Sequence, residues 1–157
     1  MDLYLLRHGD AEPRTTAVKE AARELTSKGR EDVRRVIKFV RAKLTPITIL
    51  TSPYTRARQS AEIAAKALGN AEISESRNLL PSAKPATLWN ELHARMDKTP
   101  VLLVGHEPHL SSLLAFLTGG AGNVEIKKGA LLRITINGTR EVPAGVLKWL
   151  IPPSLLR

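Results

Sequence analysis

The sequence of 157 residues contains no cysteine. Disulfide bonds, thiolate nucleophiles and cysteine-ligated metals are therefore excluded. The sequence also has no apolar run long enough to span a bilayer, and its N-terminus lacks a basic leader followed by a long apolar stretch. We therefore expect no membrane partner and a cytoplasmic location.

Aromatic residues are scarce, with two Phe, two Tyr and two Trp. Proteins that bind single-stranded nucleic acid stack the bases on aromatic side chains, and no such platform is evident here. The net charge of +9 does allow an acidic partner. Lys and Arg are interleaved with Glu and Asp along the predicted helices, as in residues 30–35. We therefore interpret the excess charge as solvated helix faces and do not expect nucleic acid to be the main ligand.

Strand-like and helix-like segments alternate along the chain. Short apolar runs predict strands at residues 3–6, 47–51 and 101–104, an outer strand at 72–74, and a late pair at 131–136 and 146–151 joined through Asn137-Gly138. Helical spacing predicts helices at residues 18–25, 28–44 (capped by Thr26 or Ser27), 53–68, 86–96 and 108–117, before an irregular tail at 152–157. This order predicts a single α/β domain over residues 1–157, a three-layer α/β/α sandwich with a mostly parallel central sheet.

Three of the predicted buried strands end in basic residues. Residues 3–6 run directly into Arg7-His8-Gly9, residues 47–51 into Ser52-Pro53-x-x-Arg56, and residues 101–104 into Gly105-His106-Glu107-Pro108. Ligands of open α/β sheets bind at the carboxyl ends of the strands, where the next helix presents its N–H groups and positive dipole end. Three basic strand ends therefore predict one anion site.

Each motif also has an ordinary structural explanation when it is taken alone. Arg7-His8 could be an incidental pair at a strand end, Arg56 a solvated residue at a helix start, and His106 part of a capping loop. Their joint occurrence at three strand ends favours the anion site. Arg58 comes two residues after Arg56, so it should face elsewhere and lie on the surface.

Taken in order, four motifs resemble the histidine phosphatase superfamily. They are Arg7-His8-Gly9-Asp10-Ala11, Leu25-Thr26-x-x-Gly29, Ser52-Pro53-x-x-Arg56-Ala57-x-Gln59-Ser60 and Gly105-His106-x-Pro108. The short chain and its Arg-His-Gly-Asp-Ala opening are most similar to the phosphohistidine phosphatase (SixA) branch. The resemblance implies that His8 is the nucleophile and that Arg7, Arg56 and His106 complete the phosphate pocket. It also implies a phosphatase that removes phosphate from phosphohistidine on proteins through a covalent phosphohistidine intermediate.

The chemistry of phosphoryl transfer suits these residue types. A transferring phosphoryl group carries spread negative charge, so its site needs fixed cations and hydrogen-bond donors. Arg7 and Arg56 have guanidinium forks that bind two phosphate oxygens at once. Their charges also disfavour protonation of His8, which must be a neutral imidazole to attack phosphorus. Because the arginines neutralise charge as a metal ion often does, we expect no metal and no other cofactor.

A general acid is missing from the place where the resemblance implies one. Family members that act on phosphate esters carry a glutamate after the second strand–helix unit, whereas residues 77–81 here read Arg-Asn-Leu-Leu-Pro. A departing alkoxide needs a proton, while an imidazole, with a reference pKa of about 6.5, needs less help. The missing acid therefore favours a phosphohistidine substrate. Glu72 and Glu75 lie earlier in the sequence and are expected outside the pocket. Three other carboxylates remain open as the general acid: Asp10, Glu12 and Glu107.

Other functions remain open beside this one. The expected partner is a phosphorylated protein or a small phosphorylated substrate, and a working acid would favour a broader phosphomonoesterase acting on small phosphate esters. A non-catalytic phosphate- or phosphoprotein-binding module is disfavoured because the basic constellation is intact. A nucleic-acid binder would show a steep salt dependence. We expect His93 to be a surface or structural residue, and His109 to be an ordinary histidine or to line the pocket mouth.

Overall fold

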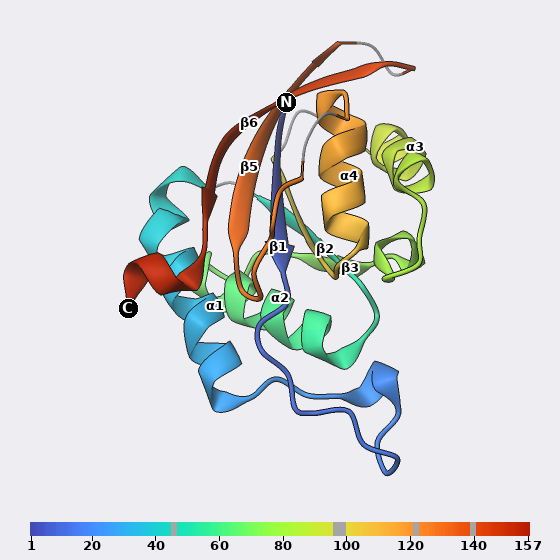
Figure 1. Cartoon of the computed structure of the whole chain (residues 1–157). Helices are drawn as coiled ribbons and strands as arrows, with labels where there is room; N and C mark the ends of the chain where they lie inside the picture. The colour runs from blue at the N-terminus through green and yellow to red at the C-terminus, as the bar shows by residue number, and fades with distance from the viewer. Residues whose placement is uncertain (45–46, 96–99, 121–122, 139–140) are drawn as a thin grey trace.

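The computed structural model describes residues 1–44, 47–95, 100–120, 123–138 and 141–157. Figure 1 shows a single twisted sheet with helices on both of its faces. Within these residues the strand order is β3-β2-β4-β1-β5-β6. The strands span Asp2–Arg7 (β1), Thr48–Thr51 (β2), Ile73–Glu75 (β3), Val101–Gly105 (β4), Leu131–Gly138 (β5) and Pro143–Ile151 (β6).

The sheet is parallel on one side of β1 and antiparallel on the other. The pairs β1–β4, β2–β4 and β2–β3 are parallel, whereas β1–β5 and β5–β6 are antiparallel. The predicted mostly parallel sheet is therefore confirmed. Its parallel part brings the carboxyl ends of β1, β2 and β4 to one edge, which is where the three basic motifs begin.

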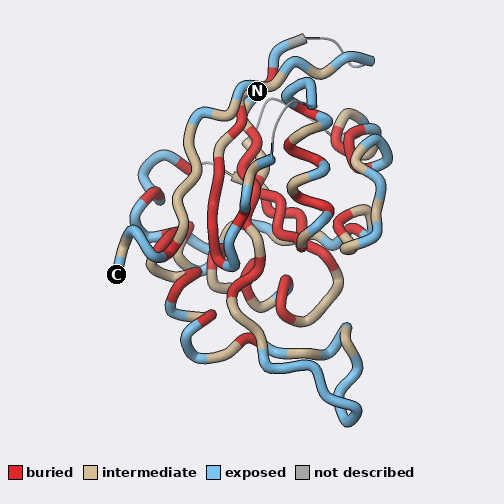
Figure 2. Tube along the Cα trace, in the orientation of Figure 1, coloured by how far each residue is buried: buried red, intermediate tan, exposed pale blue. Residues whose placement is uncertain are grey.

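Four α-helices of the described residues cover the two faces of the sheet. They are α1 (Ser27–Val40), α2 (Thr55–Ala67), α3 (Pro85–Arg95) and α4 (His109–Thr118). Alternate residues of β1 enter two cores, since Tyr4 and Leu6 pack with residues of α1 and α2, while Leu3 and Leu5 pack with residues of α3 and α4. Figure 2 shows the central strands as buried. The predicted three-layer α/β/α sandwich is confirmed. No described helix combines the length and apolarity needed to cross a membrane.

The predicted helix over residues 18–25 is wrong. Only Glu20–Ala22 form a short 3-10 turn, with no buried residue, and the surrounding loop is exposed (Figure 2). The segment is rich in residues that favour helices, but it has no apolar stripe to pack on the core. Short helices are marginal in water without such packing, so local propensity did not decide this structure.

Several boundaries also differ from the prediction. The predicted helix at 28–44 is divided into α1 and a 3-10 turn at Arg41–Lys43, and the tail expected to be irregular forms a 3-10 turn at Pro153–Leu156. Met96, the predicted end of a helix, lies outside the described residues, as do residues 139 and 140, which follow Asn137-Gly138. The short outer strand is confirmed as β3.

Two glycines hold the turn after β1 against the start of α1. A Cβ atom on Gly9 would lie 2.5 Å from the carbonyl oxygen of Gly29, and one on Gly29 would lie 2.1 Å from that of Asp10. Thr26 caps α1 by accepting a hydrogen bond from the N–H of Gly29, and its own N–H donates to the carbonyl of Asp10. The two motifs therefore form one packed unit beside His8.

Candidate active site

His8 follows β1 and is only 6% exposed. Its Nδ1 atom lies 2.7 Å from the backbone carbonyl oxygen of Gly9. Because a carbonyl oxygen can only accept, Nδ1 carries the ring proton and Nε2 carries the lone pair. The Nε–H of Arg56 donates to this Nε2 atom at 3.3 Å. The imidazole is thus held with its unprotonated nitrogen facing a cation.

Arg56 is the second residue of α2 and is 3% exposed. The helix follows β2 through Ser52-Pro53-Tyr54, so Arg56 lies in the first turn, at the positive end of the helix dipole. Its guanidinium carbon lies 5.1 Å from the centre of the Tyr54 ring. Ser60, one turn further on, accepts a hydrogen bond from the N–H of Gly9 and so attaches α2 to the turn that carries His8.

His106 follows β4 and is 1% exposed. Its ring centre lies 5.0 Å from that of His8, and its Nε2 atom lies 2.7 Å from the hydroxyl oxygen of Ser52 at the end of β2. The same hydroxyl oxygen accepts a hydrogen bond from the N–H of Tyr54 at 3.2 Å. The Nδ1 atom of His106 is buried and has no partner among the described residues. When Ser52 donates to Nε2, the ring proton resides on Nδ1 and is available to a ligand.

Arg7 ends β1 and is half-buried. One of its terminal nitrogens donates to the carbonyl oxygen of Ile126 at 2.8 Å, and its Nε atom is buried without a partner in the described part of the chain. The charge of Arg7 lowers the pKa of both His8 and His106. The structure therefore brings all four sequence-predicted site residues to one edge of the sheet.

Burial and positive charge keep both imidazoles of the site neutral. The pKa of His8 is lowered from 6.5 to about 3, mainly by burial; the hydrogen bond to Gly9 opposes this shift, and the charges of Arg56 and Arg7 add to it. Burial also lowers the pKa of His106, to about 2, with His8 and Arg56 contributing. At neutral pH the Nε2 atom of His8 is therefore unprotonated, with its lone pair directed at Arg56, and the fixed positive charge of the site is carried by guanidinium groups.

Two residues of the site were not expected from the sequence: Glu20 and Arg23. Arg56 donates from Nη1 to the carbonyl oxygen of Glu20 at 2.8 Å and from Nη2 to its carboxylate at 3.0 Å. Arg23, whose side chain is 13% exposed, makes two hydrogen bonds to the same carboxylate and lowers the pKa of His8. Both lie in the segment wrongly expected to be a regular helix, and no spacing pattern in the sequence marks them.

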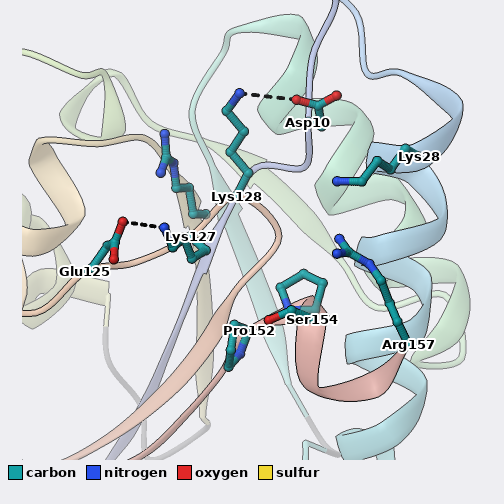
Figure 3. Close-up of a pocket in the computed structure, with 10 residues that line it drawn as sticks. Asp10, Lys28, Glu125, Lys127, Lys128, Pro152, Ser154 and Arg157 are labelled. Carbon is teal, nitrogen blue, oxygen red and sulfur yellow. Dashed lines mark hydrogen bonds and ion pairs between the residues drawn. The ribbon is translucent and has the colours of Figure 1, made fainter.

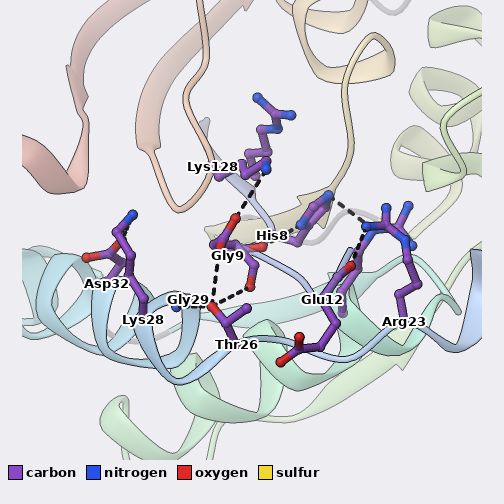
Figure 4. Close-up of polar contacts among 12 residues, drawn as sticks. His8, Gly9, Glu12, Arg23, Thr26, Lys28, Gly29, Asp32 and Lys128 are labelled. Atoms are coloured by element: carbon purple, nitrogen blue, oxygen red, sulfur yellow. Dashed lines mark hydrogen bonds and ion pairs between the residues drawn. The ribbon is translucent and has the colours of Figure 1, made fainter. Parts of the chain in front are cut away.

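The three candidate acids are placed differently. Burial alone would raise the pKa of Asp10, but hydrogen bonds from Lys128 (Figure 3) and from Thr26, which Figure 4 labels, make its pKa lower than usual. Glu107 binds the N–H and hydroxyl of Ser111 and so caps α4. Glu12 lies on the exposed loop. None of the three has a hydrogen bond to a sequence-predicted site residue among the contacts described.

The carboxylate of Glu20, which pairs with Arg56 at 3.0 Å, has a lowered pKa and is held ionised. The hydrogen bond from Arg23 is the largest cause of its lowered pKa, burial opposes it, and the charges of Arg56 and Arg23 lower the pKa further. A carboxyl group with a lowered pKa is a poor proton donor at neutral pH. In the segment where an acid was expected, Leu79 is fully buried. Among the described residues, no group of three or more His, Cys, Asp or Glu is placed to hold a metal ion.

Three further residues, Arg58, His93 and His109, make no hydrogen bond to the four site residues among the contacts described. Arg58 forms an exposed ion pair with Glu75 at 2.9 Å. His93 packs edge-on against Trp89, with their ring centres 4.3 Å apart. His109, the first residue of α4, is 1% exposed, and both of its ring nitrogens are buried without a hydrogen-bond partner among the described residues. Burial lowers its pKa.

Comparisons with known proteins identify the family and the fold. The profile of the histidine phosphatase superfamily (branch 1) matches residues 3–80. An uncharacterised protein of Picosynechococcus sp. is 32% identical over 166 residues, which cover 97% of this chain and 100% of that protein. The solved structure of the protein histidine phosphatase SixA complexed with tungstate has a TM-score of 0.88 at 24% identity, covering 100% of both chains. Mycobacterial glucosyl-3-phosphoglycerate phosphatase has a TM-score of 0.73 at 17% identity, covering 94% of this chain and 96% of that one.

Proposed function

The chain belongs to the histidine phosphatase superfamily (branch 1), and from that membership we propose that it removes phosphate from phosphohistidine on proteins, without a metal, through a covalent intermediate on His8. The observation that carries this proposal is the state of His8. Its Nδ1 proton is held by the carbonyl of Gly9, its Nε2 lone pair faces Arg56, and its pKa is lowered to about 3. The family is one of phosphatases; the substrate and the mechanism are our proposal.

The first step is attack by His8 on the substrate phosphorus. The Nε2 lone pair forms a new N–P bond, and the bond from phosphorus to the leaving nitrogen breaks with its electron pair going to that nitrogen. Charge on the phosphoryl oxygens is offset by the guanidinium groups of Arg7 and Arg56 and by the Nδ1–H of His106. The Nδ1–H of His8 keeps its hydrogen bond to the carbonyl oxygen of Gly9, and this hydrogen bond stabilises the positive charge that develops on the phosphorylated ring.

The second step is hydrolysis of this intermediate. Water attacks phosphorus, the N–P bond breaks, and its electron pair returns to Nε2 of His8. Inorganic phosphate leaves with the oxygen of that water, and the proton of the water passes to solvent or to phosphate. His8 is regenerated as a neutral imidazole, which the lowered pKa favours.

The placement of the carboxylates supports phosphohistidine as the substrate. Asp10 and Glu20 have lowered pKa values, and Glu107 caps a helix, so none of these is a ready proton donor to an alkoxide. A phosphohistidine whose second ring nitrogen is protonated loses a neutral imidazole and needs no such donor. The placement of the carboxylates therefore bears on the leaving group and does not identify the substrate protein.

Comparing substrates tests the proposal. We would measure kcat/KM for a phosphohistidine peptide, phosphoramidate, aryl phosphates of graded leaving-group pKa and sugar phosphates under one set of conditions. The expected result is a steep fall in rate as leaving-group pKa rises, with sugar phosphates slowest. Arg58→Ala, which removes an exposed ion pair, serves as a control that should leave all rates unchanged.

The alternative is a broader phosphomonoesterase acting on small phosphate esters. It is favoured by the fold likeness to mycobacterial glucosyl-3-phosphoglycerate phosphatase, a protein named for a small phosphorylated substrate. A flat dependence on leaving-group pKa, with sugar phosphates cleaved as fast as aryl phosphates, would support it and contradict our proposal. Phosphate binding without any turnover would instead indicate a non-catalytic module.

A further inference from the structure

A hollow of about 460 Å³ is lined in part by Arg7, which also belongs to the candidate active site. Its wall is formed by residues far apart in the sequence, from the end of β1, the start of α1, the segment before β5 and the C-terminal turn. Figure 3 shows Lys28 and Arg157 reaching in from one side and Lys127 lying on the other. Pro152, Pro153 and Ser154 complete a neutral part of the wall.

Cations outnumber carboxylates around this hollow. Five cationic side chains line it, namely Arg7, Lys28, Lys127, Lys128 and Arg157, whereas only Asp10 and Glu125 line it as acids. Lys128 pairs with Asp10 at 3.2 Å and Lys127 pairs with Glu125. The other three cations, Arg7, Lys28 and Arg157, form no ion pair with an acid that lines the hollow, among the contacts described.

Lys28 and Arg157 share one buried carboxylate. Lys28 lies 3.5 Å and Arg157 lies 2.7 Å from the same Asp32 oxygen, whose side chain is 5% exposed. Lys28 and Arg157 keep 63% and 42% of their side chains exposed, so both remain accessible to a ligand. One carboxylate cannot neutralise two cations, and the hollow is left with an excess of positive charge.

From this arrangement we propose that the hollow binds the carboxylates of an acidic segment of the substrate protein, next to its phosphorylated residue. The inference rests on the proposed function, because it places a protein substrate across Arg7 with phosphate on one side and acidic side chains on the other. The hollow is of the size that takes a few side chains of a ligand. Its proline rings offer apolar surface to the methylene groups of Asp and Glu. None of its ten lining residues is aromatic, which disfavours base stacking and hence single-stranded nucleic acid.

Direct binding tests the hollow without any turnover. A fluorescent, unphosphorylated peptide rich in Asp and Glu is titrated with wild type, with Lys28→Ala/Lys127→Ala, and with the matched control Lys38→Ala/Lys66→Ala on exposed faces elsewhere. Two exposed charge contacts are lost in the first variant, so we expect its affinity to fall about tenfold. The control variant should bind as wild type does, and a peptide with Gln in place of the acids should not bind. Equal affinities in both double variants would overturn the proposal, as would displacement of the peptide by duplex DNA at equal phosphate and carboxylate concentrations.

Kinetics then separate this proposal from the proposed function. Phosphohistidine peptides with acidic or Gln flanks are compared with an aryl phosphate, which has no flanks. We expect a lower KM for acidic flanks in wild type, loss of that advantage in Lys28→Ala/Lys127→Ala, and unchanged aryl phosphate hydrolysis. Binding of the acidic peptide without phosphohistidine turnover would overturn the proposed function alone. Phosphohistidine turnover with the same KM for both flanks would overturn the docking proposal alone.

Discussion

At the residue scale, the proposed chemistry depends on one atom, Nε2 of His8. Gly9 and Arg56 hold the ring from opposite sides, so the position of the proton is set by the backbone and the lone pair lies beside a cation. The neighbouring His106 ring is held in turn by the hydroxyl of Ser52 and by edge contact with the ring of Tyr54, whose N–H donates to the same hydroxyl. Changes to these side chains should therefore affect chemistry more than fold.

Replacing His8 with Ala should abolish formation of the covalent intermediate, because the attacking nitrogen is removed. Wild type is mixed with a radiolabelled substrate, quenched, and assayed for label on the protein. The label should survive alkali and be lost in acid, as expected of a phosphoramidate. His93→Ala, which removes an imidazole that packs on Trp89, should still be labelled. Equal labelling of the His8→Ala protein would show that His8 is not the nucleophile.

Replacing Arg56 with Ala should lower kcat/KM by on the order of 100-fold or more, as expected when a preorganised charge stabiliser is removed. Arg56→Lys should restore little activity, because an ammonium group cannot donate to His8, to Glu20 and to phosphate in the geometry of a planar fork. The matched changes at Arg58, whose ion pair is exposed, should leave the rate unchanged. A near-wild-type rate for Arg56→Lys would mean that the bidentate geometry is not required.

The lowered pKa of His8 also makes the stability of the protein depend on pH. Above pH 6.5 neither the folded nor the unfolded chain binds a proton at His8, whereas between pH 6.5 and about 3 only the unfolded chain does. Stability should therefore fall as the pH falls through this window, by about 2 kcal/mol from pH 7 to pH 5 for this residue. Denaturant unfolding of wild type and His8→Ala at both pH values isolates the contribution. The same pH dependence in both proteins would contradict the lowered pKa.

At the element scale, the loop from the end of β1 to the start of α1 carries the two site residues that the sequence did not mark, Glu20 and Arg23. It is closed by the pairing of Ala11 with Leu25 and by the cap of Thr26, and its exposed part brings Glu20 and Arg23 back to Arg56. The loop has few buried side chains, so its position depends on the packing at its two ends.

Gly29→Ala tests that packing. Its Cβ would lie 2.1 Å from the carbonyl oxygen of Asp10, a backbone atom that cannot move without shifting the turn that carries His8. We expect a loss of about 1–3 kcal/mol in the free energy of unfolding, as for overpacking of a well-packed site, together with a fall in kcat. Ser27→Ala, at an exposed position in the same turn, is the control. An unchanged denaturation midpoint for Gly29→Ala would contradict the close approach.

At the scale of the whole molecule, the net charge is +9, and the positive side chains fall into groups with different surroundings. Two guanidinium groups are buried or half-buried at the site, and further cations surround the adjoining hollow, while others form exposed pairs such as Arg34–Glu31. In the proposed mechanism these guanidinium groups neutralise the charge of the substrate phosphate.

Prolonged dialysis against a chelator should therefore leave phosphatase activity unchanged, because Arg7 and Arg56 supply the positive charge that a metal ion often supplies in phosphoryl transfer. Activity is measured with an aryl phosphate before and after dialysis, and again after each divalent cation is added back. A metal-dependent phosphatase treated in parallel controls for effective chelation. Loss of activity that one particular cation restores would contradict the proposed metal-independent mechanism.

Apart from the helix wrongly predicted at residues 18–25, the order of strands and helices, the α/β sandwich and the four basic residues near three strand ends followed from the sequence by itself. These features are local: the spacing of apolar residues, a cap at Thr26 or Ser27, and a histidine or arginine shortly after a buried run can be recognised without knowing the fold. Parallel strands then bring their carboxyl ends to one edge, so residues near positions 8, 56 and 106 could be expected to meet.

Only the tertiary structure decided how those residues are held and which others join them. Glu20 and Arg23 reach Arg56 from a loop that a local helix pattern described wrongly, because a short helix without an apolar face is not stabilised by packing. The proton position on His8, the ionised state of Asp10 and the close approach of Gly9 to Gly29 all depend on distances between segments far apart in the sequence. The excess charge beside Arg7 has the same origin, since its cations come from both ends of the chain and meet only when the protein is folded.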